Sequence, residues 1–195
     1  MAQLNLWVGD VDGNVDKMVK AAIEARETYQ ADLVVFPELA VLGYPPDDLL
    51  LRRGLPQKVK DGLTRIRREV AGICVIVGYP EYTEKGIFNA ADVYLGDKRL
   101  AKYRKQKLPN YGVFDEERHF AQGDKTCVFE LAGLTVGLTI CEDIWEPGPT
   151  ADVAKAGASL LVNINASPFH ETKHALRNEI LAERAKETGL SIVYV

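Results

Sequence analysis

Short runs of apolar, β-branched residues alternate with segments of helical period along this chain of 195 residues, and this alternation constrains the fold most. Strands and helices that alternate in sequence pack in layers, with helices covering the faces of sheets. The turn sequences Gly96-Asp97 and Ala132-Gly133 separate paired apolar runs and predict hairpins, so part of the sheet structure is antiparallel. We therefore expect an α/β fold with mixed sheets, in one domain spanning residues 1–195.

The individual elements follow from apolar periodicity and from the residues that interrupt it. The expected strands are Gln3–Val8, Asp32–Phe36, Ile73–Tyr79, Asn89–Leu95, Arg99–Tyr103, Cys127–Leu131, Leu134–Ile140, Ser159–Ile164 and Ser191–Val195. The expected helices are Val15–Tyr29, opened by Asn14, Pro56–Val70 and His170–Glu187. Loops rich in Pro and Gly are expected at Gly43–Asp48 and Glu146–Thr150. Because the last strand ends the chain on apolar residues, we expect the domain to continue beyond Val195.

Composition excludes several classes of protein. The net charge of −4 argues against general affinity for nucleic acid, with the basic stretch Lys98–Lys107 as a local exception. No run of eighteen apolar residues is present to cross a membrane, and the N-terminal residues do not resemble a signal peptide. Three cysteines are too few and too widely spaced for a disulfide framework or a zinc cluster. We expect a cytoplasmic protein that does not bind membranes.

Four reactive side-chain types follow predicted strands: Glu38, Lys105, Cys141 and Ser167. Because ligands bind in open α/β sheets at the carboxyl ends of strands, these groups can converge in space. Cys141 is suited to act as a nucleophile, and a carboxylate such as Glu38 can take the thiol proton and return it to a leaving amine. The Lys105 ammonium and the backbone N–H of Glu142 are suited to stabilise an oxyanion.

Each of these residues also has a plain structural interpretation. A cysteine at a strand end is often a small buried apolar side chain, and we interpret Cys74 and Cys127 in that way. Glu38 can be a capping or surface acid, and Lys105 can be one basic residue among several in its loop. Residue type and spacing alone leave both interpretations of the triad open.

Three segments, FPELAVLGYPPDDLL, YRKQKLPNYGVFDEERHF and LTICEDIW, resemble the nitrilase (carbon-nitrogen hydrolase) superfamily. More narrowly, they resemble the glutaminase domains of glutamine-dependent NAD(+) synthetases, over the whole chain. The resemblance implies a nitrilase-like α-β-β-α sandwich, further strands after the last residue, and a homo-oligomer. It also implies that glutamine is hydrolysed through a Cys thioester, and that the ammonia passes to an ATP-dependent synthetase domain or subunit for NAD biosynthesis. That part is absent here, since no SGGxDS loop occurs, so ATP and Mg are expected only there and no cofactor is expected in this chain.

The resemblance also assigns residues to roles. It implies Glu38 as base, Lys105 as oxyanion stabiliser and Cys141 as nucleophile, and the spacing to the Leu-Pro pair selects Lys105 over Lys107. The implied glutamine pocket comprises aromatic walls and polar partners for the amino-acid end of the substrate: Tyr44, Tyr111, Glu116, Trp145, Ser167 and Lys173. Trp145 as a core residue and Ser167 as a helix cap remain alternatives.

Other functions remain open at this point. The segment HETKH, residues 170 to 174, matches the H-E-x-x-H pattern of zinc hydrolases, in which both histidines bind the metal from one helix. We place Ser167-Pro168 at the start of that helix, so the pattern would fall in its first turn. A non-enzymatic α/β binding module and a nitrilase-superfamily amidase acting on another small amide are further alternatives. We favour the cysteine mechanism and expect no metal site.

Overall fold

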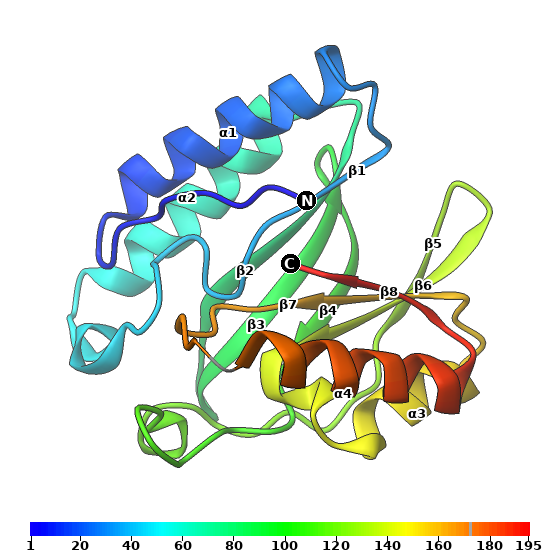
Figure 1. Ribbon diagram of the computed structural model, residues 1–195. Coiled ribbons are helices and arrows are strands. Elements are labelled where there is room, and N and C mark those ends of the chain that lie inside the picture. Colours follow the sequence, from blue (N-terminus) through cyan, green and yellow to red (C-terminus); the bar gives the residue numbers. More distant parts are fainter. Residues whose placement is uncertain (172) are drawn as a thin grey trace.

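The computed structural model describes residues 1–171 and 173–195, arranged as two four-stranded sheets between two pairs of helices. Figure 1 shows α1 (Val11–Glu27) and α2 (Leu55–Glu69) side by side on one outer face. On the opposite side lie α3 (Pro147–Lys155) and α4 (Lys173–Thr188). The expected α-β-β-α sandwich is confirmed.

The first sheet has the strand order β1-β2-β3-β4. Its strands are β1 (Leu33–Val35), β2 (Cys74–Thr83), β3 (Gly86–Leu95) and β4 (Lys98–Arg104). β1 runs parallel to β2, and the other two pairs are antiparallel, so the sheet is mixed as expected. β1, β2 and β4 therefore run in the same direction, and the C-terminal ends of β1 and β4 lie at the same end of the sheet.

The second sheet has the order β5-β6-β7-β8. Its strands are β5 (Val128–Leu131), β6 (Leu134–Ile140), β7 (Leu160–Ile164) and β8 (Ser191–Tyr194). β5 pairs with β6 antiparallel, and β6, β7 and β8 are parallel. The predicted turn Ala132-Gly133 joins β5 to β6 with positive φ at both residues, which is the geometry that two-residue hairpins favour.

Alternation along the strands separates the apolar residues into layers. In β2, Val75 and Val77 face the cluster under α1 and α2, whereas Cys74 and Ile76 face the second sheet. A second cluster fills the space between the sheets, and a third lies under α3 and α4 around Ile144, Val153 and Leu161. Successive residues of a strand point to opposite faces of the sheet. A strand that is buried on both faces therefore needs an almost continuous run of apolar residues.

Several expectations about the elements are wrong or incomplete. Residues 3–8 form no strand; Ala2 N–H donates to the Val35 carbonyl at 3.0 Å, and exposure alternates along the segment without a ladder. Helix α1 begins earlier than expected because Asp10 accepts from the Gly13 N–H at 3.1 Å, while Asn14 is buried inside it. The expected loop at Glu146–Thr150 is the start of α3.

β2 runs past Pro80, where the sequence predicted its end. The parallel partner β1 pairs only as far as Ile76, so proline at position 80 removes no N–H that a neighbouring strand needs. Among the residues that the structure describes, no helix has the length and apolar character to cross a bilayer.

Candidate active site

Glu38 lies in a turn three residues beyond β1, with its carboxylate buried at 2 % exposure. Its Oε1 accepts from Asn89 Nδ2 at 2.8 Å and its Oε2 accepts from the Ala166 N–H at 3.0 Å. Gly78 of β2 lies directly beneath this turn: a Cβ there would come within 2.6 Å of both the Leu39 nitrogen and the Pro37 carbonyl oxygen. The absence of a side chain at Gly78 thus allows the turn to pack against the strand.

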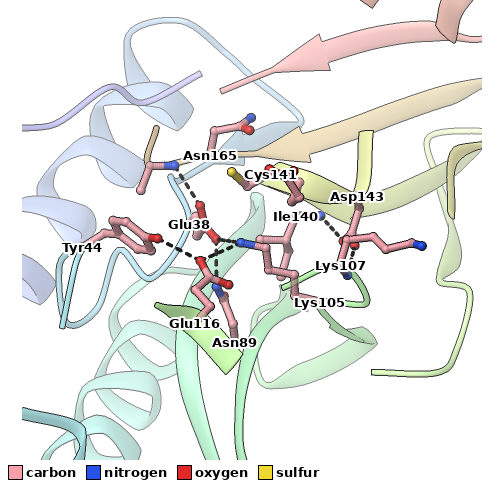
Figure 2. A network of polar contacts seen from close by, with 12 residues as sticks. Glu38, Tyr44, Asn89, Lys105, Lys107, Glu116, Ile140, Cys141, Asp143 and Asn165 are labelled. Atoms are coloured by element: carbon pink, nitrogen blue, oxygen red, sulfur yellow. Dashed lines mark hydrogen bonds and ion pairs between the residues drawn. The ribbon is translucent and has the colours of Figure 1, made fainter. Parts of the chain in front are cut away.

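Lys105 follows β4 directly and is fully enclosed, with a side-chain exposure of 0 %. Its Nζ donates to Glu38 Oε1 at 2.7 Å and to Glu116 Oε1 at 2.8 Å, and Glu116 also accepts from the Tyr44 hydroxyl at 2.9 Å (Figure 2). Burial disfavours the ammonium, but the neighbouring charges, chiefly that of Glu38, raise the pKa of Lys105 above its ordinary value. Lys105 is therefore a fixed cation between two carboxylates.

Cys141 directly follows β6, and Figure 2 shows its sulfur beside Glu38 and Lys105. Its φ of 46° lies in the left-handed region, which costs a non-glycine residue about 1–2 kcal/mol. Burial, and then the charge of Glu38, raises the pKa of the thiol well above its usual range, although Lys105 acts in the opposite direction. The raised pKa favours the protonated thiol, so activation of the sulfur calls for a base.

Asp143, two residues after Cys141, is buried with no exposed surface. Its Oδ1 accepts from the backbone N–H groups of Gln106 and Lys107, at 3.0 and 2.8 Å. Its Oδ2 accepts from the Tyr103 hydroxyl at 2.8 Å and from the Ile140 N–H at 3.0 Å. One carboxylate therefore joins the segment after Lys105 to the strand end before Cys141.

The other residues expected in the pocket occupy different places. Ser167 Oγ lies 3.8 Å from Cys141 Sγ, and the Tyr111 hydroxyl donates to Glu142 Oε1 at 2.9 Å. Lys173 opens α4, close enough to Glu142 for its charge to favour the ionised carboxylate, although burial raises the Glu142 pKa overall. Trp145 packs against the cluster under α3 and α4, as its alternative interpretation as a core residue implies.

Two clefts are lined by residues of the network or by residues adjacent to it in sequence. A cleft of about 520 Å³ is lined by residues 106–111, Glu142 and Glu146, among others. A second cleft of about 480 Å³ is lined by Glu38, Tyr44 and Ser167, together with residues of the N-terminal segment and α4. Cys141 has 4 % of its surface exposed, and its neighbours Glu142 and Ser167 line the first and the second cleft.

The zinc interpretation receives no support from the position of HETKH. Helix α4 begins at Lys173, so His170 precedes the helix and His174 lies in its first turn, and Thr172 is outside the described residues. Ser167 and Pro168 are not the start of this helix, contrary to expectation. Within residues 1–171 and 173–195, no group of three or more His, Cys, Asp or Glu side chains is arranged to hold a metal ion.

Sequence reasoning missed two residues of the polar network, Asn89 and Asp143. Asn89 sits in β3, where a polar residue between apolar neighbours was the available signal. Asp143 was visible as one of two acids after Cys141, but only the N–H of Glu142 was given a role.

The layered fold and the grouped carboxylate, ammonium and thiol define an amide hydrolase of the nitrilase type. Solved structures that share this fold include the following two. One is the glutamine-dependent NAD+ synthetase from Acinetobacter baumannii in complex with ADP, at a TM-score of 0.96 and 38 % identity, covering 100 % of this chain and 37 % of that one. The other is a variant of the amidase from Nesterenkonia sp. AN1 carrying acrylamide on its active-site cysteine, at a TM-score of 0.87 and 26 % identity, covering 99 % of this chain and 75 % of that one.

The chain belongs to the carbon-nitrogen hydrolase family, whose model matches residues 1–194. It is also similar to a curated glutamine-dependent NAD(+) synthetase from Xanthomonas campestris pv. campestris, with 44 % identity over 198 residues that cover 100 % of this chain and 36 % of that protein. The chain thus spans little more than a third of that relative's length.

Proposed function

We propose that the chain is a glutamine amidohydrolase, the glutaminase part of a glutamine-dependent NAD(+) synthetase. The observation that carries the proposal is the buried network of Glu38, Lys105 and Glu116 beside Cys141. The similarity to the Xanthomonas and Acinetobacter synthetases supports glutamine as the amide.

Glu38 is placed to act as the base. Its Oε1 accepts from Lys105 and Asn89, and its Oε2 accepts from the Ala166 N–H. Among the described contacts Oε2 thus accepts one hydrogen bond, and it can accept a second from the thiol. Glu38 takes the thiol proton as the sulfur attacks the side-chain amide carbon of glutamine. It then returns this proton to the nitrogen, so that ammonia leaves and a γ-glutamyl thioester remains.

Lys105 and the backbone N–H of Glu142 stabilise the oxyanion in this proposal. The described contacts use two of the three ammonium hydrogens of Lys105, and the third is available to the substrate oxygen. Because the ammonium is buried and already oriented, it needs little reorganisation when charge develops. Water, deprotonated by Glu38, then attacks the thioester, releases glutamate and restores the thiol.

The rim residues recognise the amino-acid end of glutamine. Tyr44, Tyr111 and Trp145 provide aromatic surface, and Ser167 and Lys173 provide polar partners for the charged groups. Glu116 holds Lys105 and the Tyr44 hydroxyl in place. This chemistry needs no cofactor and no metal in this chain.

The released ammonia passes to a synthetase domain or subunit, which binds ATP and Mg and amidates nicotinic acid adenine dinucleotide. The supporting observation is that the Xanthomonas relative is a glutamine-dependent NAD(+) synthetase of which this chain matches a third. We further propose a cytoplasmic homo-oligomer.

A second candidate is an amidase acting on a simpler amide. The Nesterenkonia amidase favours it, because this chain covers 75 % of that protein with the same fold. Ammonia release from L-glutamine and from acetamide, propionamide and acrylamide separates the two. We expect activity with glutamine only, whereas faster turnover of the simple amides would support the alternative.

Selective labelling tests the nucleophile. A diazo-ketone analogue of glutamine should add one mass increment on Cys141, because this sulfur lies beside Glu38 and Lys105, and none on Cys74 or Cys127, which we interpret as apolar core residues. Cys141→Ala should lose both the label and ammonia release. Labelling of another cysteine, or turnover by Cys141→Ala, would refute the mechanism.

A further inference from the structure

Asp143 connects the chain segments that carry two of the proposed catalytic groups. Its Oδ1 accepts from the two N–H groups that follow Lys105 in the chain, those of Gln106 and Lys107. Its Oδ2 accepts from the N–H of Ile140, the residue before Cys141. A carboxylate is rigid and planar, so bonds to both of its oxygens restrict the distance between the two segments.

The surrounding backbone explains why such a connection is needed. Lys105 belongs to the first sheet and Cys141 to the second, and backbone ladders form only within each sheet. Cys141 also adopts a left-handed conformation with a φ of 46°. The bond from the Ile140 N–H to Asp143 closes this turn from within and supports the unfavourable conformation.

Stability alone does not account for a carboxylate at this position. Burial raises the Asp143 pKa to about 6, although the N–H donors of Ile140 and Lys107 act in the opposite direction. Because the folded pKa of Asp143 lies above the unfolded value of about 3.9, the protonated side chain contributes stability. This contribution is complete below about pH 3.9 and is lost as pH rises through the folded pKa. Ionisation of Asp143 therefore lowers stability relative to the protonated form, whereas the four hydrogen bonds that its two oxygens accept hold the neighbouring segments in place.

We propose that Asp143 is a positioning residue that fixes the Cys141 sulfur relative to the Lys105 ammonium by binding the backbone beside both. This inference rests on the proposed function in taking these two residues as nucleophile and oxyanion stabiliser. Asp143 lies beneath the site and acts through Cys141 and Lys105.

Asp143→Asn is the direct test, because it keeps the size of the side chain but directs an N–H₂ group at N–H donors. Displacements of about 1 Å cost about 10²-fold in rate, so we expect alkylation of Cys141 by iodoacetamide to slow by about 10- to 100-fold. The pH profile of alkylation should move to higher pH as the ammonium moves away from the sulfur. With glutamine, kcat should fall and KM should change little.

Thr139→Val is the matched control. Thr139 lies next to Ile140 in β6, is equally buried, and accepts from Asn163 Nδ2 at 2.9 Å. The variant loses a buried hydrogen bond at the same depth but keeps every bond to Asp143, so its alkylation rate and pH profile should match those of the unmodified chain. Equal slowing in both variants would assign the effect to general destabilisation and overturn the proposal.

Tyr103→Phe keeps the test decisive if Asp143→Asn fails to fold. It removes one of the four donors to Asp143 and retains the buried ring. An intermediate slowing of alkylation supports the proposal, and an unchanged rate with an unchanged pH profile overturns it. Iodoacetamide alkylates the thiol in the absence of glutamine. If Asp143→Asn slows this alkylation but the unmodified chain releases no ammonia from glutamine, only the proposed substrate is refuted and the proposal for Asp143 stands.

Discussion

Replacing Lys105 with methionine removes the only charge that compensates two buried carboxylates in the described network. Methionine keeps most of the side-chain volume, so the change is mainly electrostatic. Glu38 Oε1 and Glu116 Oε1 both lie within hydrogen-bond distance of Lys105 Nζ, at 2.7 and 2.8 Å. Removing one partner of a buried ion pair costs about 3–5 kcal/mol, and we expect a loss of this size in unfolding free energy at about pH 8.

The loss should depend on pH with a definite sign. Burial and the charge of Glu38 raise the pKa of Glu116, and loss of the Lys105 ammonium, which lowers it, should raise it further. The stability that protonated Glu116 contributes is complete below the unfolded pKa and is lost as pH rises through the folded pKa, at about 1.4 kcal/mol per pH unit. The loss in free energy of unfolding caused by Lys105→Met should therefore be about 1–3 kcal/mol smaller at about pH 6 than at about pH 8.

Urea unfolding followed by circular dichroism at both pH values measures this difference, and ammonia release should be lost at both. Lys107→Met is the matched control, because Lys107 lies two residues away and pairs with Glu146 at the surface, with exposures of 35 % and 53 %. Its deficit should stay below about 1 kcal/mol and be independent of pH. A Lys105→Met deficit that is below about 1 kcal/mol, or equal at the two pH values, would refute the charge network described above.

Two further predictions concern the neighbours of Lys105. In Gly78→Ala the new Cβ meets backbone atoms of Leu39 and Pro37 at 2.6 Å. The Glu38 turn must therefore shift, and we expect about 1–3 kcal/mol less stability by urea unfolding and at least about tenfold less ammonia release. Gly148→Ala, whose Cβ meets no atom within 4 Å outside its two chain neighbours, should lose less than about 1 kcal/mol and keep its ammonia release, and the same losses in both variants would contradict the steric argument. Burial, and then the charge of Glu38, raises the pKa of Glu116 to about 7. The stability that protonated Glu116 contributes is lost as pH rises from about 4.3 to about 7. Glu116→Gln should therefore make the free energy of unfolding depend less on pH in this range. An unchanged slope of the urea midpoint against pH would contradict this prediction.

The sequence was sufficient for most of the fold because buried strands alternate between two apolar layers. The hairpin turns and the strand ends at Lys105 and Cys141 were also visible, since each follows an apolar run directly. Helix α3 was missed because Pro147, Gly148 and Pro149 suggested a loop. Proline in the first turn of a helix loses no hydrogen bond, so tertiary packing of Val153 could decide the outcome.

The site was harder to predict because its geometry depends on contacts distant in the sequence. Glu38, Lys105 and Cys141 were chosen from strand ends and from resemblance, and the structure brings the carboxylate, the ammonium and the thiol together. Asn89 and Asp143 were missed because their partners are set by the approach of separate segments, which local spacing does not reveal. Trp145 was expected in the pocket with a core position as the alternative, and its partly buried ring packs against the cluster that includes Ile144.

The division of the site between the two sheets has a consequence for how activity is acquired during folding. Glu38 and Lys105 come from the first sheet, Cys141 comes from the second, and an apolar layer that includes Val93 and Leu138 holds the sheets face to face. A chain in which the two sheets are not docked therefore lacks the assembled group of carboxylate, ammonium and thiol. Recovery of ammonia release during refolding should accordingly report when the two sheets come together.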